Sequence, residues 1–357
     1  MKMKNHLLSK AIALMLSIPL SLMAGITRTT TFAEGPKSIF VAGATGGQGF
    51  PAVKELLKKG FHVRGLTTGK NPKAEELKKL GAEMVVGNLF DQDSLNESMK
   101  GMDALLFIPV FPTSESPIPE YTIGYNVITA AEKAGIQYMV HTSVDRAGEH
   151  ESFAGWNEGT WANSRMYWLA KSHVIDLIKV SKIPHWAVLK PAYMMENFIP
   201  PKAIGVYPLL NKGLLVSGLN KDTRLTMMSE DDQGKLIAEA FSNFGKFDKQ
   251  EIPLAGDSLT MEEIAKTISE VTGKQVMDVY KTREELMKDE DMRAALESLF
   301  GGKGISTDNI LSATADSYEW DNAIGYTANI AKANSYGVKI STFREWCERH
   351  KDDFVID

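Results

Sequence analysis

Residues 38–50 limit the possible folds of this chain more than any other segment, because an apolar run stops there at a cluster of glycines. Residues 39–42 read as a short buried parallel strand, and Gly43, Gly46 and Gly49 follow at regular spacing before an apolar helix. A strand that turns through glycines into a helix leaves backbone N–H groups and the positive helix end where a pyrophosphate can bind. The segment therefore predicts a parallel α/β fold whose first turn binds a dinucleotide.

The three glycines are expected to serve different purposes in that turn. Gly43 permits the tight bend, Gly46 lets the backbone approach the phosphates, and Gly49 lets helix and strand pack closely. The Gly-x-x-Gly-x-x-Gly spacing resembles that of the short-chain dehydrogenase/reductase superfamily, especially its extended and atypical members. We expect the cofactor-binding residues of this loop to be Gly43, Thr45, Gly46, Gly47, Gln48 and Gly49.

The end of the second expected strand bears on which dinucleotide is bound. An acidic residue there would hold the ribose 2′-OH of NAD, but residues 61–70 contain none. Thr67, Thr68 and Lys70 stand there instead, and hydroxyls with a cation suit a 2′-phosphate better than a carboxylate does. These residues favour NADP, while NAD stays possible because Arg64 and Lys70 could equally be solvated surface charges.

Strands and helices alternate along the first half of the chain. The alternation predicts a Rossmann-type, doubly wound parallel sheet over residues 38–190. Residues 191–357 do not show this alternation of strands and helices. We therefore expect them to form a smaller α+β lobe that binds substrate and packs in part against the first domain. The ligand site should lie between the two. The expected strands are 39–42, 61–66, 83–86, 104–110, 138–143 and 186–189, with a short one near 252–254. The expected later helices are 232–241, 264–271, one charged helix over 282–301, and one within 340–353.

The N-terminal segment, residues 1–33, is typical of a signal peptide. It has a basic start, an apolar run over residues 11–26 and a small-residue cleavage site at residues 31–33. Cleavage would predict a secreted or periplasmic protein, and an uncleaved segment would leave a cytoplasmic or membrane-anchored one. A secreted location conflicts with a fold that needs a pool of reduced cofactor, and the sequence leaves that conflict open.

Composition excludes several classes of partner. The formal net charge is −5, which disfavours nucleic acids and anionic lipid as ligands. Cys347 is the single cysteine, so neither an intrachain disulfide nor a thiolate metal site is possible. The histidines lack metal-ligand spacing with acidic residues, and we expect no metal. A small-molecule substrate is the partner that remains, without a membrane contact unless the N-terminal segment is retained.

A Tyr-x-x-x-Lys pattern is the candidate for redox chemistry. Tyr167 and Lys171 would lie one turn apart on the same face of a helix over residues 166–180. A nearby cation stabilises a phenolate, so we expect Lys171 to lower the pKa of Tyr167 towards the working range. Ser143, at the end of the fifth expected strand, could polarise a substrate carbonyl while the tyrosine supplies the proton. The alternative is a solvated helix face with no chemistry.

Several further segments together resemble the NmrA-like family of atypical short-chain dehydrogenase/reductases, from Ser38 to the C-terminus. The resemblance implies a cofactor-binding Rossmann domain in which Lys171 also contacts the cofactor. The resembling segments are 41–49, 85–91, 130–136, 141–143 with Lys171, the proline–aromatic–Glu-Asn segment 190–198, the Asp-x-Gly at 232–234, and the Thr-Phe-Arg-Glu-Trp ending at 342–346.

The resemblance also implies further site residues. The segment after the fourth strand, Ile108, Pro109 and Val110, would lie along the nicotinamide. Asn88 stands where an aspartate is usual and still offers hydrogen bonds to adenine, next to Leu89. The family's usual second-strand arginine falls at Thr68, which leaves the NADP preference open. For substrate contacts the expected residues are Tyr193, Met194, Asn197 and Trp168, the last from a group of tryptophans that either lines an aromatic pocket or belongs to the core.

Two functions follow from such a resemblance. Some family members are oxidoreductases that act on quinones or other carbonyl and ene substrates, and others bind the cofactor without turning it over and act as redox sensors. Many members carry histidine where this chain has Tyr167, so the complete Tyr-x-x-x-Lys favours an enzyme. The expected activity is therefore NAD(P)H-dependent reduction of a small apolar carbonyl, quinone or enone.

Overall fold

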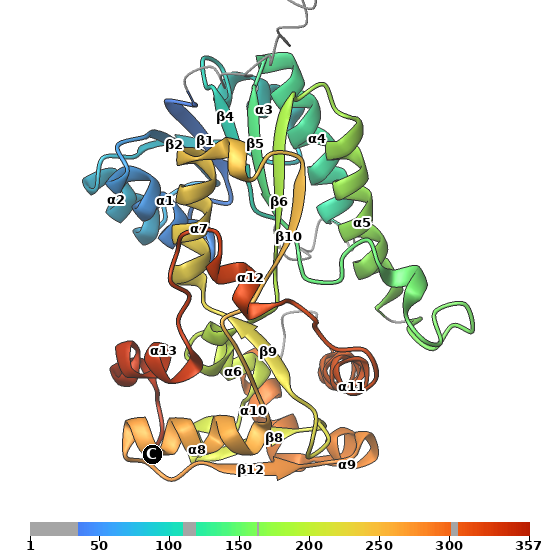
Figure 1. Cartoon of the computed structure of the whole chain (residues 1–357). Helices are drawn as coiled ribbons and strands as arrows, with labels where there is room; N and C mark the ends of the chain where they lie inside the picture. Colours follow the sequence, from blue (N-terminus) through green and yellow to red (C-terminus); the bar gives the residue numbers. More distant parts are fainter. Residues whose placement is uncertain (1–34, 110–118, 163, 301–305) are drawn as a thin grey trace, which may run out of the picture. The chain divides into compact units, whose positions relative to one another are not determined.

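The computed structural model describes residues 35–109, 119–162, 164–300 and 306–357, so the expected signal peptide lies outside the described residues (Figure 1). The main sheet is parallel throughout, in the order β10-β6-β5-β4-β1-β2-β3. This order confirms the Rossmann-type doubly wound sheet. Its strands are β1 (Ser38–Ala42), β2 (His62–Thr67), β3 (Glu83–Val86), β4 (Ala104–Phe107), β5 (Tyr138–Thr142), β6 (His185–Pro191) and β10 (Gln250–Leu254).

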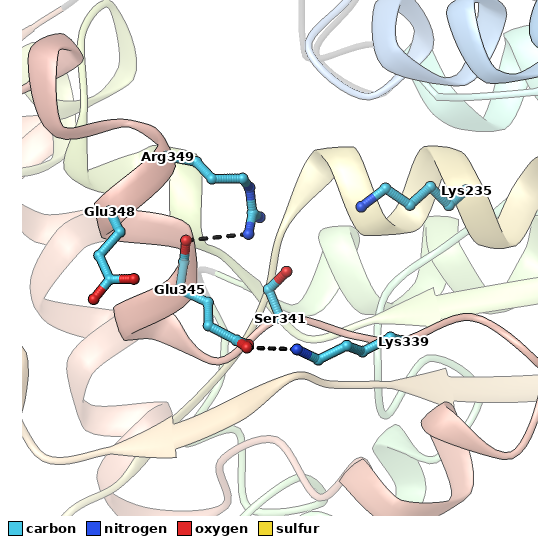
Figure 2. Close-up of a pocket in the computed structure, with 6 residues that line it drawn as sticks. All are labelled: Lys235, Lys339, Ser341, Glu345, Glu348 and Arg349. Atoms are coloured by element: carbon cyan, nitrogen blue, oxygen red, sulfur yellow. Dashed lines mark hydrogen bonds and ion pairs between the residues drawn. The ribbon is translucent and has the colours of Figure 1, made fainter.

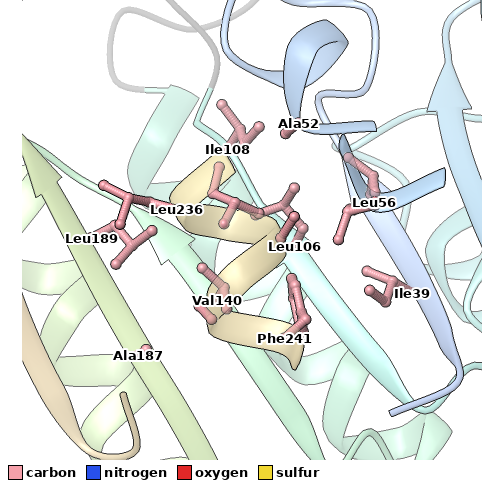
Figure 3. Packing of buried hydrophobic residues seen from close by; sticks show 14 of the residues in the cluster. Ile39, Ala52, Leu56, Leu106, Ile108, Val140, Ala187, Leu189, Leu236 and Phe241 are labelled. Carbon is pink, nitrogen blue, oxygen red and sulfur yellow. The ribbon is translucent and has the colours of Figure 1, made fainter. Parts of the chain in front are cut away.

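Alternate residues of each central strand pack into two different cores, as the two-residue period of a strand requires. Ile39 and Val41 of β1 face α1 and α7, whereas Phe40 and Ala42 face α3, α4 and α5. Figure 3 shows Leu106, Val140 and Leu189 of the next three strands meeting the apolar sides of α1 and α7. The helices of the two layers are α1 (Gly49–Lys58), α2 (Pro72–Lys79) and α7 (Glu230–Ser242), and α3 (Gln92–Ser98), α4 (Pro119–Ala134) and α5 (Arg165–Val180).

The chain leaves the sheet after β6 and later returns to it. The short strand expected near residues 252–254 is β10, which pairs in parallel with β6 and forms the edge of the main sheet. The helix expected over 232–241 is α7, which packs along α1 on the cofactor-loop side of the sheet. The segments of the C-terminal half that pack on the main sheet are α7, β10 and α12 (Ile330–Asn334), which contacts β10.

The remaining C-terminal residues form a lobe with a third apolar core, which includes Phe198, Phe343 and Trp346. A three-stranded sheet, β11-β9-β7, and a parallel pair, β12-β8, lie within this lobe. Its strands are β7 (Tyr193–Met194), β8 (Leu214–Ser217), β9 (Leu225–Met228), β11 (Asp257–Leu259) and β12 (Met277–Tyr280). Its helices are α6 (Lys202–Val206), α8 (Met261–Thr272), α9 (Arg283–Lys288), α10 (Glu290–Phe300), α11 (Thr307–Ala323) and α13 (Phe343–Arg349). Within the described ranges, no helix is long and apolar enough to cross a bilayer.

The single charged helix expected over residues 282–301 is wrong, because the chain breaks at Asp289 into α9 and α10. Asp289 has extended backbone angles, and its carboxylate accepts a hydrogen bond from the Met292 N–H at 2.9 Å. The same carboxylate is paired with Lys281. Asp289 therefore caps a new helix instead of continuing the previous one, as short acidic side chains do at helix starts.

Candidate functional site

The glycine-rich loop connects β1 to α1 by a turn that requires glycine at two positions. Gly43 has a φ of +96°, which side chains rarely tolerate, and a Cβ at Gly49 would overlap the Gly43 carbonyl oxygen. The turn is closed by the Gly46 N–H, which donates to the Gly43 carbonyl at 3.1 Å. The tight bend at Gly43 and the close packing at Gly49 are thus observed geometry.

The first turn of α1 is suited to bind an anion. The helix begins at Gly49, no side-chain oxygen caps it at Gln48, and the first turn holds no acidic residue. Unpaired N–H groups at a helix start carry partial positive charge, so they attract a phosphate. The roles of Thr45, Gly46 and Gly47 in that binding remain predictions.

The residues at the end of β2 differ in how far they are exposed to solvent. Thr68 and Lys70 are exposed, whereas Thr67 is buried and its hydroxyl donates to the Gly69 carbonyl at 3.0 Å. Arg64 lies within β2, where its guanidinium donates to the carbonyls of residues 98 and 100 and pairs with Glu83 at 2.9 Å. Arg64 therefore has a packing role, and Thr68 with Lys70 are the groups left at this strand end to meet a 2′-phosphate.

The expected adenine and nicotinamide contacts lie at two loop positions. Asn88 is exposed, and its amide oxygen accepts the Phe90 N–H at 2.9 Å, which leaves its amide nitrogen for a ligand. Leu89 is half-buried, and its carbonyl accepts from Asn126 at 3.3 Å. Pro109 is half-buried and ends a described segment, while Val110 lies outside the described residues.

Ser143 follows β5, on the sheet face that α4 and α5 cover. His141, two residues earlier on this face, stacks on Phe107 with ring centroids 4.9 Å apart. The Ser143 hydroxyl is buried and makes no hydrogen bond with the described residues. A buried hydroxyl without a partner is unusual in a folded protein, so it is available to a ligand oxygen.

Lys171 is buried in an ion pair that the sequence did not suggest. Its ammonium lies 2.8 Å from a carboxylate oxygen of Glu120 on α4, and the two residues are 7% and 8% exposed. The second oxygen of Glu120 is buried without a hydrogen-bond partner in the described part of the chain. The positive charge of Lys171 is therefore already paired with the Glu120 carboxylate of α4 when no ligand is bound.

The expected lowering of the Tyr167 pKa is wrong for this arrangement. Desolvation of the phenol, followed by the Glu120 carboxylate, raises the pKa of Tyr167 above its usual value. The Lys171 ammonium lies over the tyrosine ring, 5.4 Å from its centroid, and its charge is balanced by Glu120. Although 44% of Tyr167 is exposed, its hydroxyl stays protonated at neutral pH, so it can act as a hydrogen-bond or proton donor.

The expected substrate residues divide into two groups. Tyr193 and Asn197 lie together in the lobe, where the Tyr193 hydroxyl hydrogen-bonds Asn197 and the Tyr207 hydroxyl, the latter at 3.1 Å. Met194 is 9% exposed within the core that contains α1 and α7. Trp168 is 3% exposed and packs on Phe153 and Trp320, as a core tryptophan does. Tyr193 and Asn197 are thus half-buried, hydrogen-bonded polar groups of the lobe, whereas the other two are packed in apolar cores.

Sequence reasoning missed Asp321, in the last turn of α11, and Tyr326, which lies just beyond that helix. Tyr326 packs on Trp320 with ring centroids 5.1 Å apart and contacts Ala192 beside β7. Burial raises the pKa of Asp321 to about 8, and the pKa of Tyr326 is raised by burial and then by the neighbouring Tyr167, Asp321 and Tyr193. Both groups are therefore neutral acids at pH 7. No local motif marks them, because Tyr167 and Tyr193 are over 100 residues away in the sequence.

Burial of His141 predicts a specific acid sensitivity. Desolvation, and then the charge of Lys171, lower the pKa of His141 to about 3 from an unfolded value near 6.5. Between these pH values the unfolded chain takes up a proton that the folded chain cannot, so stability should fall on acidification by up to about 1.4 kcal/mol per pH unit. Urea unfolding between pH 7.5 and 5 should show a shallower pH dependence for His141→Gln than for the wild type. Parallel curves would contradict the assignment.

Two surface hollows lie apart from the expected catalytic and cofactor residues. One, of about 470 Å³, is charged and is shown in Figure 2, where Glu345 meets Lys339 and Arg349. The other, of about 440 Å³, is apolar and includes Phe198 and Tyr207 of the lobe. Among the described residues, no three His, Cys, Asp or Glu side chains gather as a metal site would require.

A family model, a known protein and a solved structure each match most of this chain. The NmrA-like family model matches residues 35–322. The NmrA-like family domain-containing oxidoreductase malD of Malbranchea aurantiaca is 24% identical over 343 residues, which cover 88% of this chain and 97% of malD. The NADPH-dependent quinone oxidoreductase QOR2 of Escherichia coli, solved with NADPH, has a TM-score of 0.64 at 20% identity, over 87% of this chain and 99% of its own.

A second solved structure is a regulator. NmrA, described as a negative transcriptional regulator and solved with NADP, has a TM-score of 0.63 at 17% identity, over 88% of this chain and 95% of its own. These structural likenesses support the fold that the strand order gives. Because the family model spans most of the sequence, the chain belongs to the NmrA-like family.

Proposed function

We propose that this protein is an NAD(P)H-dependent oxidoreductase that reduces a small apolar carbonyl, quinone or enone, with NADPH as the preferred donor. The observation that carries the proposal is the buried, unpartnered Ser143 hydroxyl on the sheet face that α5, the helix of Tyr167 and Lys171, covers. A buried polar atom of this kind costs stability unless a ligand satisfies it. The names of malD and QOR2 as oxidoreductases support the same class.

Cofactor binding is assigned to the loop and the strand ends. The uncapped first turn of α1 would hold the diphosphate, and Thr68 with Lys70 would meet a 2′-phosphate. Asn88 keeps its amide nitrogen for the adenine. When bound, the nicotinamide supplies the hydride, and the protein contributes position, polarity and exclusion of water.

The remaining chemistry falls to this chain's own hydroxyl groups. Ser143 would donate a hydrogen bond to the substrate oxygen and so polarise it. The phenol of Tyr167, protonated at neutral pH, would supply the proton to that oxygen as negative charge develops on it. Lys171 would hold the ribose and steady the tyrosine ring beneath its ammonium. Asp321 and Tyr326, both neutral at pH 7, add uncharged polar neighbours that suit a neutral substrate better than an anion.

Replacing Tyr167 with phenylalanine should reduce turnover by about 100-fold or more, because a positioned proton donor contributes on that scale. The assay follows NADPH oxidation at 340 nm with quinones, aldehydes and enones, and a parallel titration measures NADPH binding, which should survive. Tyr125→Phe is the matched control, since Tyr125 is also exposed and lies on the neighbouring helix α4. Wild-type turnover in Tyr167→Phe would remove that residue from the reaction.

The second candidate function is that of a cofactor-responsive binding protein without catalysis. It is favoured by the likeness to NmrA, a regulator that was solved with NADP. Such a protein would bind NADPH as tightly and change only its affinity for a partner. Tight NADPH binding together with no turnover across the substrate panel would support this candidate against the enzyme.

A further inference from the structure

The N-terminal turn of α7 connects the cofactor loop to the C-terminal lobe. Gln233 donates a hydrogen bond to the Gln48 side chain at 3.1 Å, and a Cβ at Gly234 would lie 3.0 Å from the backbone nitrogen of Ala52. Glu230, the first residue of α7, is 7% exposed, and its carboxylate fills the space where a Cβ of Gly47 would stand. A carboxylate therefore lies directly beside the loop that is expected to hold a diphosphate.

A cation of the lobe accompanies this carboxylate. Lys202, at the start of α6, forms an ion pair with Glu230, and the two side chains are 31% and 9% exposed. The pair is shielded from solvent on the Glu230 side, so salt screens it less than a surface pair. Lys202 therefore brings a positive charge from the lobe to the carboxylate that lies beside Gly47.

A second carboxyl group lies next to the pair but leaves its charge balance unchanged. Glu196 accepts hydrogen bonds from the Glu230 backbone N–H and from the Trp346 indole, both at 3.0 Å, and its other oxygen is buried without a partner among the described residues. Burial, and then the Glu230 charge, raise the pKa of Glu196 to about 8. Glu196 is therefore mostly neutral at pH 7, and Lys202 balances the single charge of Glu230.

We propose that Glu230 and Lys202 belong to the cofactor site: the Glu230 carboxylate opposes the bound diphosphate, and Lys202 offsets that repulsion from the C-terminal lobe. The inference rests on the proposed function, because it requires a dinucleotide at the Gly43–Gly49 loop. Cofactor affinity then depends on where the lobe holds Lys202, although the loop belongs to the sheet domain. The anionic diphosphate is the ligand part concerned, so NADPH and NADH are affected alike.

A double-mutant cycle on this pair tests the proposal by NADPH titration, read from quenching of tryptophan fluorescence and checked by calorimetry. Lys202→Met should weaken NADPH binding by about tenfold, because it leaves the Glu230 charge uncompensated beside the phosphates. Glu230→Gln should tighten binding by about threefold to tenfold, since the amide keeps the shape and removes the charge. The double variant should bind within about threefold of wild type.

The matched control is Lys281→Met. Lys281 is also 31% exposed and also pairs with a buried carboxylate of the lobe, that of Asp289, but it contacts no residue of the glycine loop or α7. It should leave the dissociation constant unchanged, and melting temperatures would show the folding cost of losing a lobe ion pair. If Lys202→Met fails to fold, Glu230→Gln alone decides, because only the proposed repulsion predicts tighter binding.

Two failures can be told apart. Equal NADPH dissociation constants in wild type and Glu230→Gln would overturn the role of this pair while leaving cofactor binding at the loop intact. Weaker binding in Glu230→Gln would also overturn it, since the carboxylate would then be a supporting group. Absence of NADPH and NADH binding in the wild type would overturn the proposed function, and this inference with it.

Discussion

Replacing Gly49 with alanine should abolish NADPH binding and destabilise the protein by about 1–3 kcal/mol or more. The added Cβ would overlap the Gly43 carbonyl oxygen and approach Ala44, which are backbone atoms that cannot rotate away. The loop would have to open, and the first turn of α1 would lose its position at the end of β1. Fluorescence titration with NADPH and a thermal melt measure the two effects.

Gly35→Ala is the control for this substitution. A Cβ there would make an ordinary contact, 3.7 Å from the Phe241 carbonyl oxygen. Both NADPH affinity and melting temperature should stay near wild type. Retained NADPH affinity in Gly49→Ala would show that the loop does not need its observed packing to bind the cofactor.

Replacing Lys171 with methionine should have the second-largest effect, on stability and turnover together. The substitution leaves the Glu120 carboxylate buried without its partner at 2.8 Å, and breaking a buried pair in this way costs about 3–5 kcal/mol. Turnover should also fall, because the ammonium over the Tyr167 ring is lost. Urea unfolding and NADPH oxidation measure these two losses.

A second substitution separates structure from catalysis at this position. Adding Glu120→Gln to Lys171→Met removes the unpaired charge, so much of the stability should return while turnover stays low. Lys179→Met is the control on the same helix, because Lys179 pairs with Glu251 at a more exposed position. Recovery of turnover together with stability in the double variant would show that Lys171 acts only by packing.

The first half of the fold could be predicted because its signals are local. The strands from β1 to β6 are short apolar runs followed by turn residues, and a two-residue or helical period is readable within one window. The glycine loop is equally local, since Gly43 and Gly49 are fixed by contacts six residues apart. The family resemblance then pointed to Ser143 at the end of β5 and to Lys171 within α5.

The rest could not be predicted because its partners are distant in sequence. Glu120 and Lys171 are on different helices, and Glu230 reaches Gly47 only because α7 returns to pack on α1. Such pairs depend on tertiary packing, which the periodicity of a single sequence does not reveal. The break at Asp289 is the exception, because an acidic cap inside a charged run was a local signal for two helices.

The return of α7 and β10 to the sheet has a consequence for how this molecule can be divided. A fragment ending at residue 190 would lack the edge strand that pairs with β6, and it would uncover the apolar sides of Val53, Leu56 and their neighbours that α7 protects. An unpaired inner strand and a bare apolar layer both promote association between chains. Genetic exchange of the C-terminal lobe between relatives would therefore have to carry α7 and β10 along, so a helix and an edge strand of the sheet domain are inherited together with the lobe.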